Sequence, residues 1–402
     1  MENIDFSAFL KDENAEKAKQ GIVINTGNGI MHLFGAVKNS DYVGLGDDAL
    51  FFAPFCSRDD VEKIMNPKSA SDYLLKLRAE SIVDNPRLIR VFLKRKAGYT
   101  NWSLSEYYKK QDRDPLYLKF LSKGNYDKLK NVPAGSAYIN TVNAVCSKSP
   151  KGNVIAVSEP LEQYLYFMNI FFYGDDFGID EHNRFNAFLI AQRLIAGFES
   201  PDFDLDPRCI LPESVEIFMS GLTNIQYQFI LGHEYSHHLL GHLSDANLVS
   251  TNFSEIVRGF EGTYKLSHYK YSHKLEYDAD WHAIKFIKGN KQFRNDVANG
   301  AFLALMYMKV SSMVLDYINP ARSTLMSTHP DPIQRIWKLR ARLNNKLGFD
   351  RDQLTNNISF LESYTNDFLN HFVAFNFDDF EKYGSVYLPS YKKKLLIDRL
   401  DF

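Results

Sequence analysis

Apolar residues recur every three to four positions over much of this chain, which is the spacing of one face of an amphipathic helix. Short segments rich in Gly, Pro, Asn and Asp, the residues typical of turns, separate these stretches. The pattern predicts helices over 12–20, 60–65, 70–80, 86–96, 161–173, 181–198, 222–243, 293–318 and 333–343. We therefore expect a mainly helical protein.

Fewer stretches show the alternation or the continuous apolar runs typical of β-strands. Strands are expected over 21–24, 30–37, 153–158 and 213–220. In the last of these, Val215, Ile217 and Met219 alternate with residues such as Glu216. The edge of such a strand can hold an extended peptide as an added strand, and an ordinary sheet strand is the other interpretation. The polar segment 244–273 is expected to be a loop.

Together these elements predict an α+β fold that is predominantly helical. A chain of 402 residues should hold more than one lobe, because single hydrophobic cores stop growing at roughly 250–300 residues. We expect a mixed α/β N-terminal region of unknown role over 1–150. A second domain should cover 151–345, followed by a helical C-terminal extension over 346–402.

Composition and charge narrow the class of protein. Hydrophobic residues make up 45% and charged residues 24%, as in a globular protein, and a formal net charge of −2 gives no reason to expect a nucleic-acid partner. Cys56, Cys146 and Cys209 are too few and too scattered for a disulfide framework or a cysteine zinc site, which suits a reducing compartment. The N-terminus lacks the pattern of a secretory signal. The longest apolar runs, such as 301–308, are far shorter than the ~18 residues of a membrane span. We expect a cytoplasmic protein without a membrane span, and nothing in the sequence marks an oligomeric state.

The pattern H-E-x-x-H occurs at 233–237, inside a predicted helix. Residues four apart lie one above the other on a helix face, so His233 and His237 continue an apolar row that includes Phe229. Two imidazoles on one face can share a zinc ion. Glu234, beside the first histidine, would then act as general base on a metal-bound water. The other interpretation is a helix in which histidines recur by chance and make ordinary hydrogen bonds.

A catalytic zinc needs a third protein ligand. The same helix does not supply it, because the positions that would carry Gly and His in an extended motif are Leu240 and Leu243. Glu276 offers a carboxylate from a later helix. Asp280, one turn further on, would accept the second ring N–H of a ligand histidine and fix its tautomer. A solvated acidic helix face is the other interpretation of this pair.

Three motifs follow one another along the chain: H-E-x-x-H at 233–237, then Glu276 and Asp280 in the pattern E-x-x-x-D, then S-x-H-P at 327–330. Together they resemble the zinc metallopeptidases of the CAAX-processing and heat-shock type. The resemblance covers roughly residues 215–340. A soluble H-E-x-x-H protein of this size is also similar, more weakly, to phage-exclusion peptidases of the Lit type.

The resemblance implies a zincin-like domain of the gluzincin kind with one Zn²⁺ per chain. His233, His237 and Glu276 would be the metal ligands, and Glu234 the catalytic base. His329 would approach the site and stabilise a developing oxyanion. Its other interpretation is a residue of the loop that leads into the next helix.

His238 and His242 form a second row near the motif. They could support a zinc site, but the expectation is that they face solvent.

The sequence therefore predicts a zinc-dependent endopeptidase with a protein or peptide substrate, in which Glu234 takes a proton from water and passes it to the leaving amine. Two alternatives stay open. One is a binding or regulatory protein on a metallopeptidase scaffold. The other is a zinc hydrolase that acts on a non-peptide amide or ester.

Overall fold

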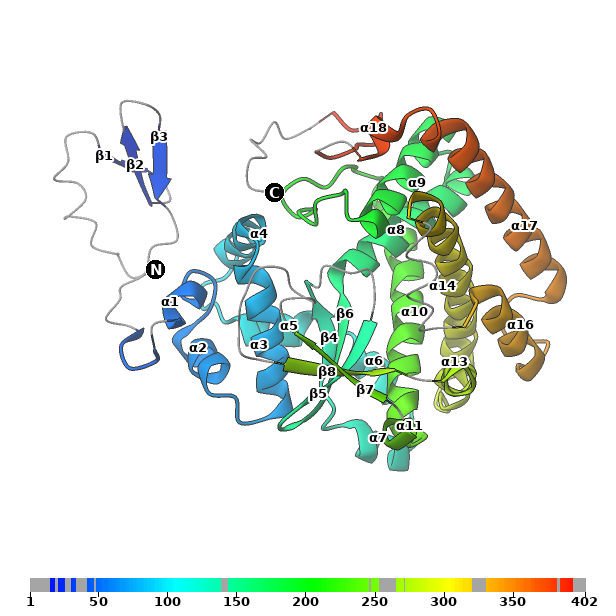
Figure 1. Cartoon of the computed structure of the whole chain (residues 1–402), viewed down its shortest axis with the longest axis horizontal. Coiled ribbons are helices and arrows are strands. Elements are labelled where there is room, and N and C mark those ends of the chain that lie inside the picture. Colours follow the sequence, from blue (N-terminus) through cyan, green and yellow to red (C-terminus); the bar gives the residue numbers. More distant parts are fainter. Residues whose placement is uncertain are drawn as a thin grey trace. The chain divides into compact units, whose positions relative to one another are not determined.

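Helices dominate the structure, and two small sheets accompany them (Figure 1). The predicted α+β class, predominantly helical, is confirmed. The chain folds as two units, divided between Gln111 and Asp112. This computed structural model describes residues 15–18, 21–25, 30–33, 42–46, 48–138, 144–245, 247–252, 265–270, 272–319, 330–381 and 384–392.

The first unit combines a small antiparallel sheet, in the order β1-β2-β3, with several helices. Its described elements are β1 (Ala15–Ala18), β2 (Gly21–Asn25), β3 (Ile30–Leu33), α1 (Ala49–Phe52), α2 (Arg58–Met65), α3 (Ala70–Val83), α4 (Pro86–Ala97) and α5 (Leu104–Gln111). The helices predicted at 60–65, 70–80 and 86–96 are confirmed, with ends shifted by a few residues. The helix predicted over 12–20 is wrong where the chain is described, because strand pairing with β2 overrides the intrinsic helix preference of the residues in Ala15–Ala18.

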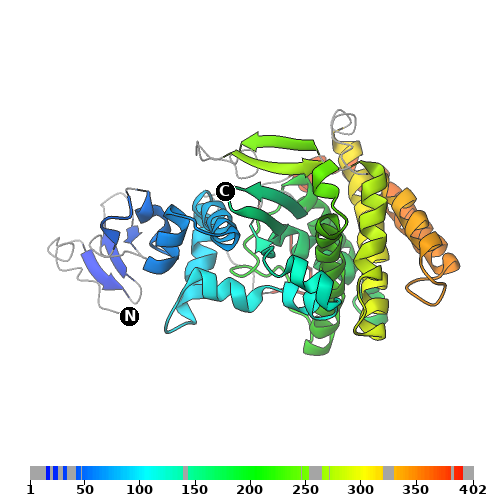
Figure 2. The same ribbon diagram turned by 90° about the horizontal axis from the view of Figure 1, so that it is seen from below.

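A second sheet lies in the second unit. Its strands are β4 (Ala134–Ala137), β5 (Ala144–Ser149), β6 (Gly152–Ser158), β7 (Asn247–Asn252) and β8 (Lys265–Lys270), in the order β4-β6-β5-β8-β7. Strand β4 pairs parallel with β6, and the other pairs are antiparallel. Figure 2 shows the long β7–β8 hairpin from the side. The predicted strand 153–158 is confirmed as β6. The expected loop 244–273 contains β7 and β8, which pair with each other, and β8 also pairs with β5, a strand far away in sequence.

The helices of the second unit surround its hydrophobic core. They are α6 (Asp114–Lys119), α7 (Lys123–Leu129), α8 (Glu159–Tyr173), η2 (Gly174–Phe177), α9 (Glu181–Ala196), α10 (Glu213–Leu239), α11 (His242–Asp245), α13 (His273–Lys285), α14 (Lys291–Ile318), α16 (Pro332–Arg342), α17 (Arg351–Asp367), η3 (Phe368–Val373) and α18 (Phe377–Glu381). Helix α10 packs against α8, α13 and α14, so it runs through the middle of this core (Figure 1). Helix α14 comes so near α10 that a Cβ atom on Gly300 would lie 2.7 Å from the backbone carbon of Ile225. Only glycine, which has no Cβ, permits this close approach, and α14 continues through it without a break.

The segment 213–220, predicted as a strand, is the beginning of α10. Pro212 precedes the helix, and Glu213 and Glu216 lie in its first turn, where acidic side chains favour the helix dipole. Val215 and Met219 are buried, whereas Ile217 is 66% exposed. The residues that matter for packing are thus four apart, and the alternation of apolar residues misled the prediction. Because the segment is helical, it offers no strand edge at which an extended peptide could bind.

The expected domain limits differ from the division that the structure shows. A limit at 150 would separate β5 from β6, which pair from Ala144 opposite Val157 to Ser149 opposite Gly152. Helix α17, beyond the other expected limit at 345, packs on α14 within the same unit. Residues 112–400 therefore form one unit in which the sheet and the helices share a core.

Helix α14 is the one helix among the described residues that is long and apolar enough to cross a membrane, by length and composition alone. In its most apolar window, 56% of the residues are buried inside the protein. The helix packs against α10, α16 and α17. This packing is that of a core helix.

Candidate metal centre

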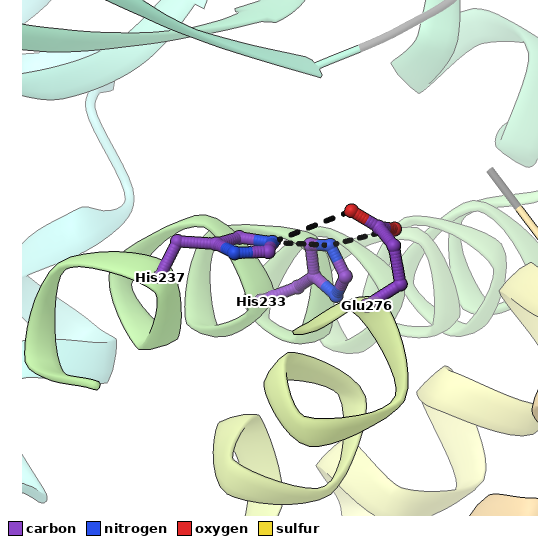
Figure 3. Close-up of side chains that lie close together, drawn as sticks. All are labelled: His233, His237 and Glu276. Atoms are coloured by element: carbon purple, nitrogen blue, oxygen red, sulfur yellow. Dashed lines mark hydrogen bonds and ion pairs between the residues drawn. The ribbon is translucent and has the colours of Figure 1, made fainter. Parts of the chain in front are cut away.

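Helix α10 brings His233 and His237 together. One helical turn separates them, so their rings point from the same face, and both are buried. The two Nε2 atoms lie 3.2 Å apart and face each other (Figure 3). Phe229, which the sequence places in the same row as these histidines, is buried as well.

The carboxylate of Glu276, from the first turn of α13, completes a group of three possible ligands. Its Oε2 lies 3.5 Å from Nε2 of His233, and its Oε1 lies 3.6 Å from Nε2 of His237 (Figure 3). Glu276 is fully buried. Two ligand atoms bound to a tetrahedral zinc at about 2.0–2.2 Å are roughly 3.3–3.6 Å apart. The donor set and its spacing therefore fit a zinc ion.

His233 is held from its other side by charged residues. Its Nδ1 donates a hydrogen bond of 2.9 Å to Oδ1 of Asp280, one turn after Glu276 on α13. Arg335, from α16, donates to both oxygens of Asp280, at 2.6 and 2.8 Å. This arrangement leaves Nε2 of His233 facing His237 and Glu276. Asp280 thus lies against the ring nitrogen of His233 that faces away from Glu276.

Charges determine the protonation of this site in the absence of a metal. Burial alone would lower the pKa of His233, but Asp280 and Glu276 outweigh it and raise that pKa to about 10. Burial would raise the pKa of Asp280, but Arg335 and His233 lower it below its ordinary value. Asp280 is therefore a carboxylate at neutral pH, as a hydrogen-bond acceptor for His233 must be.

The other ring nitrogen of His237 meets a histidine. Its Nδ1 lies 3.1 Å from Nδ1 of His242, and both rings are buried. His238, on the far side of α10, is half-buried, with its Nε2 at 3.3 Å from Sγ of Cys146. Burial lowers the pKa of His238 to about 4. The expectation that His238 and His242 face solvent is wrong, because β5 covers one and the turn after α10 buries the other.

Glu234 follows His233 on α10 and is buried. Its negative charge is one of those that favour the protonated form of Arg335, so its carboxylate lies within electrostatic reach of the same cluster. His329, the last of the residues singled out in the sequence, lies outside the described residues.

Tyr117 on α6 joins the two helices that carry the possible ligands. Its ring lies against Gly232 on α10, where a Cβ atom would come within 2.6 Å of it. Its hydroxyl donates a hydrogen bond of 2.7 Å to the backbone oxygen of Ala283 on α13. Gly232, directly before His233, is thus required for this close approach.

The sequence alone does not indicate the roles of Tyr117 and Arg335 or the position of His242. One signal for Arg335 was present, since it lies four residues before the buried Leu339 in a predicted helix and so places a charge on an apolar face. For Tyr117 no local pattern exists, because it acts across more than a hundred residues. For His242 the signal is Gly241, which permits the turn described below.

A protein-family model described as Peptidase U49 matches residues 183–352, a stretch that contains α10, α13 and α16. Comparison with curated proteins and with solved structures finds no match. The matched family is a family of peptidases, and the match supports a peptidase, a hydrolase whose substrate is a protein or a peptide.

Proposed function

We propose that this protein is a zinc-dependent endopeptidase of the gluzincin kind, with a zincin-like catalytic region around α10 and α13. His233, His237 and Glu276 would hold one Zn²⁺ per chain. The observation that carries the proposal is the convergence of two imidazole nitrogens and a carboxylate at 3.2 to 3.6 Å from one another. Three such atoms, each able to give a lone pair, are the ligands that a catalytic zinc uses.

When bound, the zinc ion would make a water molecule more acidic and polarise the carbonyl of the scissile bond. The remaining steps belong to the chain itself. Glu234 would take a proton from the attacking water and give it to the leaving amine nitrogen. Asp280 would keep the proton of His233 on Nδ1, and Arg335 would keep Asp280 ionised and in place. His329 stays a proposed donor to the oxyanion.

The match to a peptidase family favours a peptide bond over a non-peptide amide or ester. A cytoplasmic location is also part of the proposal. Cys56, Cys146 and Cys209 are buried thiols that form no disulfide with one another, which suits a reducing compartment.

The test combines metal analysis with one substitution. Purified protein should contain about one zinc per chain. Glu234→Gln removes the base but none of the proposed ligands, so it should keep the zinc and the fold while hydrolysis falls by roughly 10²–10⁴-fold. Glu213→Gln, at the exposed start of the same helix, is the matched control and should be fully active.

Because the substrate is to be found, activity is best read in cells by mass spectrometry of protein termini. Termini that appear with the wild type and the Glu213→Gln control, and disappear with Glu234→Gln, would identify cleaved proteins. A wild-type protein that takes up no zinc, or a Glu234→Gln variant that produces the same termini, would refute the proposal.

A further inference from the structure

The turn after α10 carries a histidine back to the metal centre. Helix α10 ends at Leu239, and Gly241 adopts a left-handed backbone conformation with φ of 74°. Glycine reaches this conformation without the steric cost that other residues meet. His242 follows as the first residue of α11, and its Nδ1 lies 3.1 Å from Nδ1 of His237.

Two ring nitrogens at hydrogen-bond distance need one N–H and one lone pair between them. Nε2 of His237 faces Nε2 of His233 and the carboxylate of Glu276, so it is the atom placed to bind a metal. A neutral imidazole that binds a metal through Nε2 carries its proton on Nδ1. Nδ1 of His237 would therefore donate to Nδ1 of His242, whose own proton would be on Nε2.

We propose that His242 is the positioning residue of His237, and that it does for this ligand what Asp280 does for His233. The inference rests on the proposed zinc site. It gives the two ligand histidines unlike partners, since His233 donates to a carboxylate paired with Arg335, whereas His237 donates to another imidazole. His242 fixes both the tautomer and the ring orientation of His237.

Burial distinguishes this contact from a chance encounter of surface rings. His237 is fully buried and His242 is buried beside it, with ring centroids 5.2 Å apart and planes at 65°. A buried polar nitrogen without a partner costs free energy. The pairing of the two Nδ1 atoms gives each ring a partner in the same contact.

The test measures zinc affinity by competition with a chromophoric chelator, for the wild type, four variants of His242 and one control. His242→Ala and His242→Leu remove the acceptor, and we expect zinc affinity to fall by about 10–100-fold. His242→Asn and His242→Asp place an oxygen on the atom bonded to Cβ, where histidine carries Nδ1. These two variants should bind zinc nearly as tightly as the wild type. His371→Ala, at an exposed position, is the matched control.

Leucine fills most of the space of histidine, so a loss that came from packing alone would be small in His242→Leu and larger in His242→Asn. That order, or wild-type affinity in both His242→Ala and His242→Leu, would overturn the inference. If the alanine variant fails to fold, the leucine and asparagine variants still decide the question. A wild-type chain that binds no zinc would instead refute the proposed function and the inference with it, so the two failures differ.

Discussion

Two clusters of buried charged residues lie in the second unit, and only one of them resembles a catalytic site. The metal cluster consists of His233, His237, Glu276, Asp280 and Arg335. The arginine cluster consists of Arg193, Glu199, Asp202, Asp206 and Arg208. Both are almost fully buried, and both hold more carboxylates than guanidinium groups. Burial and an excess of carboxylates over guanidinium groups therefore do not distinguish them.

The pairing of donors with acceptors does distinguish them. In the arginine cluster, Glu199 lies 2.9 Å from Nε of Arg193 and 3.1 Å from Nε of Arg208, and Asp202 contacts Arg208 as well. In the metal cluster, three atoms that can each give a lone pair converge, as described above. In the arginine cluster, guanidinium groups are the partners of the carboxylates. In the metal cluster, the three atoms with lone pairs are placed to hold a cation between them. Donor chemistry, more than buried charge, marks the candidate site.

The arginine cluster also differs from the metal cluster in its structural role. Arg193 donates to the backbone oxygens of Phe380 and Gly384, and Tyr387 donates to Asp206. These contacts attach the C-terminal segment to α9 and to the loop before α10. The cluster therefore stabilises the unit without belonging to the site.

The largest effect should come from breaking the arginine cluster. Arg208→Met leaves Glu199 and Asp202 without this guanidinium, so the free energy of unfolding should fall by about 3–5 kcal/mol, as urea denaturation would measure. Zinc bound per folded chain should stay the same. Arg351→Met, at an exposed position, serves as the control. An unchanged free energy of unfolding would mean that the arginine cluster does not stabilise the fold.

The converse substitution in the metal cluster is Asp280→Asn. It removes the carboxylate that holds Nδ1 of His233, and zinc affinity should fall by about 10–100-fold with a smaller effect on folding. Asp278→Asn, on the same helix but paired with Arg342 away from the site, is the control. Equal zinc affinity for Asp280→Asn and the control would return Asp280 to a purely structural role.

Without a metal, the ring of His233 should carry an additional proton. With its pKa at about 10, His233 carries a proton in the metal-free site at neutral pH, and zinc must displace that proton. Zinc binding should therefore release about one proton at pH 7–8. At pH values below that pKa, the apparent zinc affinity should increase by up to tenfold for each unit by which the pH rises. The raised pKa also stabilises the metal-free fold below pH 6.5, and this contribution is lost as the pH rises towards 10.

Calorimetry of zinc binding in buffers of different ionisation enthalpy would count the released protons. Asp280→Asn should reduce the number, because Asp280 is a main cause of the raised pKa. A proton count near zero in the wild type would contradict the description of the metal-free site.

The smallest effect should follow from Tyr117→Phe. This change removes one buried hydrogen bond, to Ala283, and keeps the ring against Gly232. The free energy of unfolding should fall by about 1 kcal/mol in thermal or urea denaturation. Tyr126→Phe, at an exposed position, should have no effect. If Tyr117→Phe also lowers zinc affinity, the contact between α10 and α13 positions the ligands and not only the fold.

The local elements of this protein can be predicted from neighbouring residues along the chain. Helix periodicity located α2, α3, α4, α8, α9, α10, α14 and α16, and the four-residue spacing of His233 and His237 placed both on one buried face. Glu276 and Asp280 could be identified for the same reason, since their spacing also lies within one helix. These predictions succeed because the repeat of a helix is a property of neighbouring residues.

How these elements combine depends on contacts between residues that are far apart along the chain. The strand predicted at 213–220 became the start of α10 because Val215 and Met219 pack into a core that the segment itself does not reveal. Strands β7 and β8 form in a polar stretch because they pair with each other and β8 pairs with the distant strand β5. Arg335 and His242 reach the candidate metal centre, and Tyr117 joins α10 to α13 beside it, through contacts with other elements and a left-handed turn. Such contacts depend on distances across the fold, and the order of residues along the chain does not contain those distances in any local pattern.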